Sequence, residues 1–467
     1  MHWVCLLLPH LALDAVLRRH PEPDRPWALI AGPAQRRVLH SVNPAARALG
    51  LRPGQSLAAA QAISSGFATA EYDPGAERRA HELLAAWAYR FSSQVSTQLP
   101  HAIVLEIGRS LKLFGPWPRL EARLREELHG LGFRHRLVAA PNPHAARVLA
   151  NAHDGLGLTE ATLLQGLGQL PVERAGFERE VAQALQRMGL RTLRQVFALP
   201  RDALARRFPR AVLAHLDAIR GEAPPLRYYR PPDTFEQRIE FEHEVESSQA
   251  LLFPLRRLCA DLAAYLAGRD GGVQRFRLLL EHERCADSTV EVGLLAPERE
   301  AAMLFELARG RLEQARAPAP VRGLRLLAHE LPPFVPAERD LFDARPQQAV
   351  PWAQLRERLR ARLGDDAVHG LVLQGDHRPE HAWSEQGGST PLPAALPPRP
   401  GWLLPQPTPL RDHRLTVLAG PERIESGWWD GEVRRDYYLV ETSSGQRAWA
   451  WCHPGERGPF MLHGWFA

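Results

Sequence analysis

Carboxylates beside apolar runs are the residues of this chain that could hold a metal ion, because magnesium prefers oxygen ligands. Asp14 lies one helical turn beyond an apolar run near the amino-terminal end, and Glu106 lies in a second apolar run, 102–107. The stretch before Glu106, residues 98–104, contains no carboxylate. Asp14 and Glu106 could in principle form one site, but octahedral coordination by oxygens is demanding, so the pattern does not favour it. We expect no bound metal and no cofactor.

Arginine is the second informative residue type. Lys112 is the single lysine among 58 basic residues, the net charge is +5 and the isoelectric point is about 9.3. Guanidinium groups bind phosphates well, which fits a nucleic-acid partner. A genome with high GC content favours arginine codons and explains the same bias without any ligand. Because the charge excess is small, it supports nucleic-acid binding only weakly.

The cysteines argue against a metal or disulfide framework. Cys5, Cys259, Cys285 and Cys452 are widely scattered and form no CxxC pair. Such a set is typical of a reducing cytoplasm. No uncharged apolar run reaches about 18 residues, so we expect no transmembrane helix. The apolar start of the chain lacks a basic segment and a cleavage site, and we interpret it as a buried strand followed by a helix.

The 467 residues predict three or four domains in an α+β chain. Strands alternate with helices over 1–165, helices and turns dominate 166–232, and the order β-α-β-β-α-β is expected over 233–337. The region 338–467 should begin with a helix, 352–363, that places Leu355, Leu359 and Leu363 on one apolar face. Residues 391–409 are rich in proline and should be extended.

Several motifs in sequence order resemble those of the Y-family DNA polymerases. The run HAIVLEIGRSLKLFG, residues 101–115, is similar to the palm strand and turn of that family. The segments 43–63 and 135–151 resemble its fingers segment and its later palm motif, and 188–200 resembles the helix-hairpin-helix of its thumb. Residues 241–331 resemble its little finger. The resemblance implies a palm and fingers, a helical thumb, a little finger and an additional C-terminal α/β tail.

The catalytic positions of the family are empty of carboxylates here. The resemblance places the aspartate of the first strand on Leu7, within one residue, and the Asp-Glu pair of the palm hairpin on His101 and Ala102. None of these three side chains has a carboxylate to ligate magnesium. Glu106 matches a later aspartate that does not belong to the metal pair. We therefore expect an inactive homologue of a DNA-directed DNA polymerase with no catalytic residue.

The C-terminal end resembles one group within the family. Residues 421–467, with GWWD at 427–430 and DYY at 436–438, are similar to the tail of the ImuB group, the catalytically inactive Y-family homologues of bacterial mutasomes. The segment HRPE at 377–380 is also similar. The resemblance implies a cytoplasmic scaffold for damage-induced translesion synthesis and mutagenesis in the SOS response. Its partners would be DNA, the sliding clamp, an error-prone DnaE-type polymerase and a RecA-like ImuA protein.

Two sets of residues are expected to make these contacts. Partner docking is assigned to Trp428, Trp429, Tyr437 and Tyr438, although such aromatics also build ordinary small β cores. Phosphates would be bound by backbone amides at Gly189 and by arginines, with Arg275 and Arg277 on one strand face opposite Gln274 and Phe276. The full set of expected DNA-binding residues is Arg147, Gly189, Arg191, Arg194, Arg206, Arg207, Arg210, Arg275 and Arg277. Any one of these arginines could equally be a solvated surface residue.

A clamp-binding peptide is expected at residues 338–342. Leu341 and Phe342 suit an apolar pocket, with Asp340 before them, and Glu338 stands where such peptides carry glutamine. The same apolar pair could instead pack against the preceding domain. Two other functions stay open: a template-dependent polymerase of low activity that uses Glu106, and a protein-interaction module that does not bind DNA.

Overall fold

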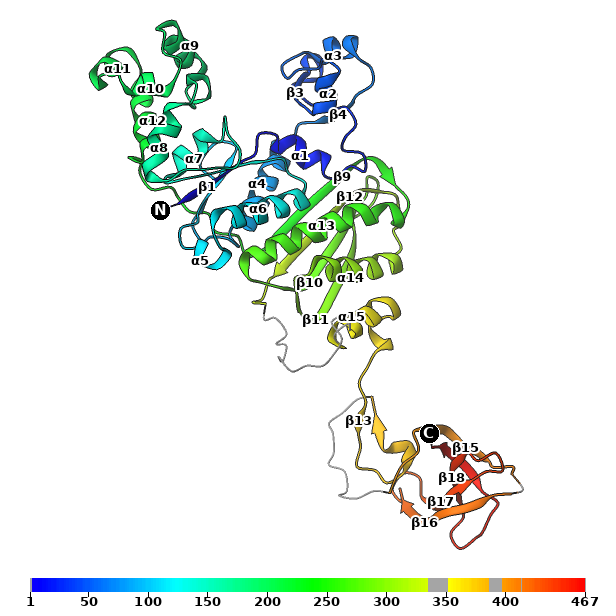
Figure 1. Ribbon diagram of the computed structural model, residues 1–467. Coiled ribbons are helices and arrows are strands. Elements are labelled where there is room, and N and C mark those ends of the chain that lie inside the picture. Colours follow the sequence, from blue (N-terminus) through cyan, green and yellow to red (C-terminus); the bar gives the residue numbers. More distant parts are fainter. Residues whose placement is uncertain (1, 335–351, 386–396, 413, 467) are drawn as a thin grey trace. The chain divides into compact units, whose positions relative to one another are not determined.

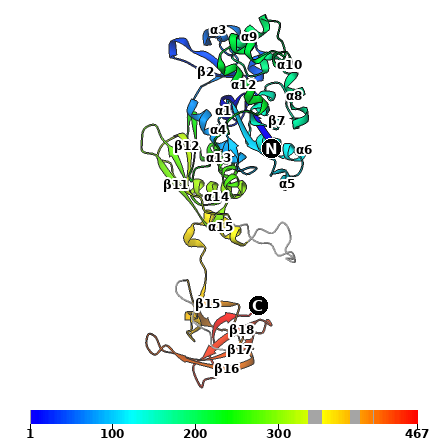
Figure 2. The ribbon, with the colours of Figure 1, turned by 90° about the vertical axis from the view of Figure 1, so that its left-hand side faces the viewer.

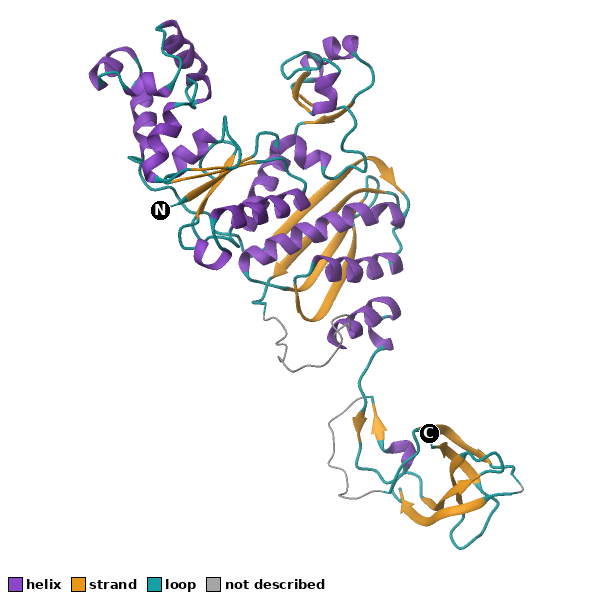
Figure 3. Cartoon of the chain, in the orientation of Figure 1, coloured by secondary structure: helices purple, strands orange, loops and turns teal. Residues whose placement is uncertain are grey.

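The chain folds into two compact units, Met1–Arg362 and Leu363–Ala467, which are described separately (Figure 1). The computed structural model describes residues 2–334, 352–385, 397–412 and 414–466. Helices and strands occur in both the amino-terminal half and the region beyond residue 220, which confirms the expected α+β class (Figure 3). The predicted four-part division is finer than these two units and stays a prediction.

A five-stranded sheet lies at the centre of the first unit. Its order is β5-β6-β1-β7-β8, and β1 runs antiparallel to both β6 and β7. Every residue of β1 and β6 is buried, because α1, α4 and α6 cover one face while α7 and the helices of residues 160–220 cover the other. The elements are β1 (Trp3–Leu7), α1 (Leu11–Leu17), α4 (Pro74–Ala88), β5 (Val95–Ser96), β6 (Ala102–Glu106), α5 (Leu111–Phe114), α6 (Trp117–Leu131), β7 (Arg136–Ala140), α7 (Pro143–Leu149) and β8 (Leu156–Gly157).

A small subdomain is inserted between α1 and α4. It consists of a three-stranded sheet of order β3-β2-β4 and two short helices. Asn43 and Ser56 cap these helices by accepting hydrogen bonds from the amides of Ala46 and Ala59. The segment 43–63 therefore forms two capped helices. The bounds are β2 (Trp27–Ala31), β3 (Val38–Val42), α2 (Pro44–Ala48), α3 (Leu57–Ile63) and β4 (Ala68–Glu71).

The region 160–220, called the helical segment below, consists of short helices joined by tight turns. Gly189 adopts a φ of +82° at the turn between α9 and α10, a backbone conformation that favours glycine. The helices are α8 (Glu160–Gly168), α9 (Arg179–Arg187), α10 (Leu193–Phe197), α11 (Arg201–Arg207) and α12 (Arg210–Arg220). Their apolar side chains join the cluster that covers β1 and β6.

A second sheet follows, and its element order β-α-β-β-α-β confirms the expectation. The sheet is antiparallel with order β11-β10-β12-β9, and α13 and α14 pack on one of its faces. Figure 2 shows the strands on one side and the two helices on the other. The other face is open and carries charged side chains. The elements are β9 (Phe235–Val245), α13 (Ser248–Arg269), β10 (Val273–Glu281), β11 (Ser288–Glu298), α14 (Ala301–Gln314) and β12 (Val321–Glu330).

The helix α15 (Trp352–Leu363) has the predicted bounds but not the predicted orientation. Leu355 and Leu363 of the expected apolar face are exposed, whereas Glu357 and Ala361 are buried. The small Ala361 lies against Gly310 of α14, and the Glu357 carboxylate accepts a hydrogen bond from the Leu295 amide at 2.8 Å. Close backbone approach and one buried polar contact thus outweigh the leucine stripe.

The second unit is built mainly of strands. A five-stranded antiparallel sheet has the order β15-β19-β18-β17-β16, and a short hairpin, β13-β14, precedes it in the chain. The strands are β13 (Val372–Leu373), β14 (Trp383–Ser384), β15 (Trp402–Pro409), β16 (Thr416–Ser426), β17 (Val433–Glu441), β18 (Arg447–Cys452) and β19 (Met461–Trp465). The proline-rich stretch ends in β15, which is extended as expected.

Candidate functional site

The positions that the sequence singles out as missing carboxylates lie next to each other in the fold. Leu7 at the end of β1 is the direct cross-strand partner of Ala102 at the start of β6, and the Leu8 amide donates to the His101 carbonyl at 2.8 Å. Leu7 and Ala102 are buried in the cluster shared with α7, and His101 is exposed with a φ of +53°. Aliphatic side chains in this place have no oxygen with which to hold a cation.

The two carboxylates that remain nearby are used elsewhere. Glu106 pairs with Trp3 at the opposite end of β6, and its Oε1 accepts hydrogen bonds from the amides of His2 at 3.3 Å and Gly108 at 2.9 Å. Asp14 accepts from the amide and the Nε of Arg134 at 2.9 and 2.7 Å. Burial raises the pKa of Asp14, and Arg134 opposes this shift. Among the described residues, no group of three or more His, Cys, Asp or Glu could hold a metal ion.

Arg147, one of the expected DNA-binding residues, is engaged inside the protein. Its Nε donates to the Pro100 carbonyl at 2.8 Å and its Nη1 to Asn151 Oδ1 at 2.6 Å. Burial lowers the pKa of the Arg147 guanidinium. These contacts tie α7 to the loop that precedes β6. Arg147 therefore positions the loop of His101, and its binding to DNA would require these hydrogen bonds to break.

The turn at Gly189 does not present free amides. The Gly189 amide donates to the Gln186 carbonyl at 2.8 Å, and the amides of Arg191 and Thr192 both donate to Gln195 Oε1, at 2.7 and 3.1 Å. The predicted phosphate contact through the Gly189 amide would have to replace an internal hydrogen bond. Gly189 is needed for its positive φ, since a Cβ there would meet nothing within 4 Å.

The arginine side chains of the helical segment are open to solvent, unlike the backbone amides of the Gly189 turn. All five expected side chains are exposed, and none forms an ion pair with another described residue; they are Arg191, Arg194, Arg206, Arg207 and Arg210. The neighbouring Arg201 is bound by Asp217 through two hydrogen bonds of 2.6 Å. Exposed guanidinium groups of this kind can contact phosphates through their side chains.

Arg275 and Arg277 lie on the open face of the second sheet, as expected, while Phe276 is buried under the helices. Gln274 does not join Phe276: it is exposed and its Nε2 donates to the Leu295 carbonyl at 3.2 Å. The register of β10 shifts between Val273 and Arg275, and this irregularity breaks the simple alternation. The cross-strand neighbours of Arg277 are Glu291 and Leu327, so its surroundings carry mixed charge.

Comparisons with known proteins support the resemblance. A family model described as the impB/mucB/samB family, a Y-family model, matches residues 11–151. Proteins named ImuB from two strains of Caulobacter vibrioides are 29% identical over 457 residues, covering 90% of this chain and 100% of each relative. The chain is therefore similar to the ImuB proteins over most of its length, and to the Y-family model over residues 11–151.

Solved structures similar to this chain include DinB from Sulfolobus solfataricus, which is 13% identical and has a TM-score of 0.41. The match covers 72% of this chain and 100% of that chain. An insertion ternary complex of Dbh DNA polymerase has 14% identity, covers 71% and 99%, and has a TM-score of 0.41.

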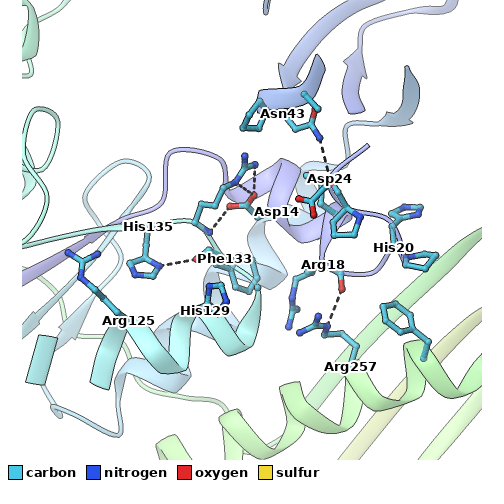
Figure 4. Close-up of a pocket in the computed structure, with 18 of the residues that line it drawn as sticks. Asp14, Arg18, His20, Asp24, Asn43, Arg125, His129, Phe133, His135 and Arg257 are labelled. Atoms are coloured by element: carbon cyan, nitrogen blue, oxygen red, sulfur yellow. Dashed lines mark hydrogen bonds and ion pairs between the residues drawn. The ribbon is translucent and has the colours of Figure 1, made fainter. Parts of the chain in front are cut away.

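A cavity of about 1160 Å³ in the first unit was not expected from the sequence (Figure 4). Its polar groups bind one another across α1, α6 and α13. Arg18 donates to Asp261 and to the Leu131 carbonyl, and Arg257 Nε donates to the Arg18 carbonyl at 3.1 Å. No residue expected to contact DNA or a partner lines this cavity. Because Arg18 and Arg257 link α1 to α6 and α13 here, we interpret the cavity as a junction between the helices of the two sheets.

The second unit presents two exposed tryptophans in one turn. Trp428 is 80% exposed and Trp429 is 59% exposed, in the turn between β16 and β17, with their rings in a T-shaped arrangement. Arg378 of the HRPE segment is only 4% exposed and donates to Asp430 of this turn at 2.5 Å and to Asp376 at 2.7 Å. The two segments singled out from the sequence therefore contact each other.

The two tyrosines of the expected docking set are placed inside the second unit. Tyr437 is buried: it stacks on Trp449 and its hydroxyl is 2.7 Å from His463 Nδ1. Tyr438 is partly buried against Phe460. The assignment of Tyr437 to partner docking is therefore wrong, because its ring belongs to the core. The expected clamp residues Glu338, Asp340, Leu341 and Phe342 lie outside the described residues.

Charge divides unevenly between the two units. Residues 363–467 contain 9 arginines and 13 acidic residues, which gives this unit a net charge of −4. Because the whole chain carries +5, residues 1–362 carry +9. A surface that binds phosphates is favoured in the basic unit and disfavoured in the acidic one. Of the described residues, no helix is long and apolar enough to cross a membrane.

Proposed function

We propose that this ImuB-like chain is a non-catalytic scaffold of translesion synthesis that binds DNA and the sliding clamp and recruits an error-prone DnaE-type polymerase. The observation that carries the proposal is the pairing of Leu7 with Ala102 at the metal position. Phosphoryl transfer by two metal ions needs carboxylates that clamp both ions. Here the cross-strand pair is aliphatic and buried, so the fold holds its strands together without the ligands of the reaction.

The main alternative is a weak polymerase that uses Glu106. Glu106 lies four residues along β6 from Ala102, about 13 Å away, and its carboxylate closes the turn at Gly108. Primer extension with magnesium or manganese separates the two functions. We expect no incorporation above background in the wild type or in Glu106→Gln. Incorporation by the wild type that disappears in Glu106→Gln would support the enzyme instead.

DNA binding rests on the exposed arginines of the helical segment and on the charge of +9 over residues 1–362. We expect primer-template DNA to bind with a steep salt dependence. Removing Arg206 and Arg207 together as glutamines should lower the slope of log affinity against log salt by about 1 to 2. Arg201→Gln is the matched control, because Asp217 already engages that guanidinium. Absence of binding even at low salt would favour a protein-interaction module without DNA binding.

Clamp binding is assigned to the segment 338–342, between the second sheet and α15. Replacing both Leu341 and Phe342 by alanine should abolish binding to the sliding clamp, since this pair would enter the apolar pocket. Glu338→Gln should strengthen binding, because glutamine is the residue that such peptides carry. Unchanged affinity in both variants would reject this segment as the clamp-binding site.

The remaining partners are assigned to the second unit. Its exposed tryptophans and net charge of −4 suit protein docking better than phosphate binding, which supports recruitment of the DnaE-type polymerase and of a RecA-like ImuA protein. The cytoplasm is the compartment for this role, and the four cysteines are free thiols. Trp428→Ala combined with Trp429→Ala should reduce co-purification of either partner; retention of both would exclude this turn as the docking point.

A further inference from the structure

A groove of about 500 Å³ lies in the second unit between the β13-β14 region and the turn that joins β16 to β17. Trp383, 46% exposed, lines it from β14, and Trp429 lines it from the turn. Arg378 lies beneath, and Asp376 and Asp430 contribute carboxylates. The groove thus combines two exposed indole rings with acidic oxygens.

The walls of this groove are fixed by hydrogen bonds. Arg378 binds Asp376 and Asp430 together, and its Cζ lies 5.6 Å from the centre of the Trp429 ring. Gly427 has a φ of +82°, and a Cβ there would lie 2.5 Å from the Gly431 carbonyl oxygen and 2.6 Å from Arg378 Nη1. Only glycine lets the turn close this tightly. The turn that carries Trp429 is therefore held in place before any ligand binds, which reduces the ordering cost of association.

The charge around the groove favours a cation. The single guanidinium of Arg378 faces two carboxylates, so the three groups together carry −1 when His377 and His381, which also line the groove, are counted as neutral. The unit as a whole carries −4 on the same count. The Asp430 side chain is 52% exposed and therefore keeps acceptor positions that face solvent. An aromatic face beside a carboxylate attracts a guanidinium or ammonium group, whereas the same surface repels a phosphate.

We propose that this groove binds an arginine or lysine side chain of a protein partner, with the cation against the face of the Trp429 indole that Arg378 does not cover, and with its charge on Asp430. This assignment rests on the proposed scaffold function, and it names the chemistry of the partner surface. Trp383 forms the opposite wall, and Trp428, exposed beside Trp429, extends the contact to apolar residues next to the basic side chain.

The test uses the full chain labelled with fluorotryptophan and followed by fluorine NMR, with resonances assigned by single Trp→Phe variants. The probe is acetyl-arginine methylamide, and the matched control probe is acetyl-citrulline methylamide, which has the same shape without the charge. We expect the arginine probe to shift the resonances of Trp429 and Trp383 but not that of the exposed Trp402. Asp430→Asn should weaken the arginine probe about two- to fivefold.

Three results would overturn the proposal: equal shifts with citrulline, equal shifts at Trp402, or no change in Asp430→Asn. A thymidine oligonucleotide that shifts Trp429 more than the arginine probe would assign the groove to nucleic acid instead. The scaffold function fails separately, because primer extension and DNA binding test the first unit. If DNA binding failed, the fluorine shifts would still support the groove. If the shifts were absent, DNA binding would still support the scaffold function.

Discussion

Leu7 and Ala102 face each other across β1 and β6, at the positions where the proposed scaffold lacks the carboxylates that a polymerase would need. Both side chains are buried against α7 and the helical segment. Apolar packing therefore fills this part of the sheet. This packing has a measurable consequence, because a buried apolar contact tolerates an introduced charge poorly.

Restoring the carboxylates should destabilise the protein. We expect Leu7→Asp with Ala102→Glu to lower the free energy of unfolding by about 3 kcal/mol or more, since two like charges would be buried side by side. Urea unfolding with and without magnesium chloride measures this. Leu7→Asn with Ala102→Gln is the neutral control and should cost less. Full recovery of stability in magnesium, together with primer extension, would show that the catalytic geometry survives.

The ion pair between Arg18 and Asp261 joins the helices of the two sheets in the first unit. Both side chains are almost fully buried, and Arg18 Nη1 lies 2.9 Å from Asp261 Oδ2. Asp261→Ala should cost about 3–5 kcal/mol, because it leaves a buried guanidinium without its partner. Arg18→Met with Asp261→Leu should cost much less. Similar losses in the single and double variants, measured by denaturant unfolding, would show that packing rather than charge governs this contact.

The sequence predicts local elements well because each carries its own periodicity. The bounds of α15 and the order β-α-β-β-α-β over 233–337 agree with expectation. It misses contacts between distant residues. Asp261 lies 243 residues from Arg18, and no local pattern links them.

The candidate docking site shows the same limit. Exposed Trp429 and buried Tyr437 look equivalent as aromatic residues, and only the fold separates them. Arg378 is recognisable from its motif, but its role in holding Asp430 depends on a contact across 52 residues. The predicted orientation of α15 was wrong for a related reason, because Ala361 packs more closely than the leucines can.

Gly268 allows α13 to approach α4 at van der Waals distance. A Cβ on Gly268 would lie 1.9 Å from the Ala86 carbonyl oxygen. Alanine is the better helix former by about 1 kcal/mol, but the collision outweighs this gain, so Gly268→Ala should destabilise the first unit. Gly130→Ala in α6 is the control, since a Cβ there meets nothing within 4 Å, and it should be neutral or stabilising. Equal thermal midpoints for the two variants would contradict the close approach.

His463 should make the second unit sensitive to mild acid. Burial lowers the pKa of its imidazole; the nearby Arg435 also lowers it, whereas Glu380 raises it. The Tyr437 hydroxyl accepts from Arg435 Nη1 at 3.0 Å and shares a hydrogen bond of 2.7 Å with His463 Nδ1. Because burial lowers the pKa of His463, the folded unit favours the neutral ring. The unfolded chain takes up this proton at a higher pH than the folded chain. The contribution of His463 to the free energy of unfolding is therefore fully present above about pH 6.5, and it is lost as the pH drops below that value.

Removing the imidazole should flatten that dependence. His463→Phe loses the hydrogen bond with Tyr437 and should be less stable at every pH by about 1 kcal/mol. Its stability should also change less than that of the wild type between pH 7.5 and pH 5.5, conditions that bracket the titration of an ordinary histidine, about 6.5. Urea unfolding followed by tryptophan fluorescence gives both quantities. His453→Gln, at an exposed position, should keep the wild-type dependence. An unchanged dependence in His463→Phe would mean that other groups govern the response to acid.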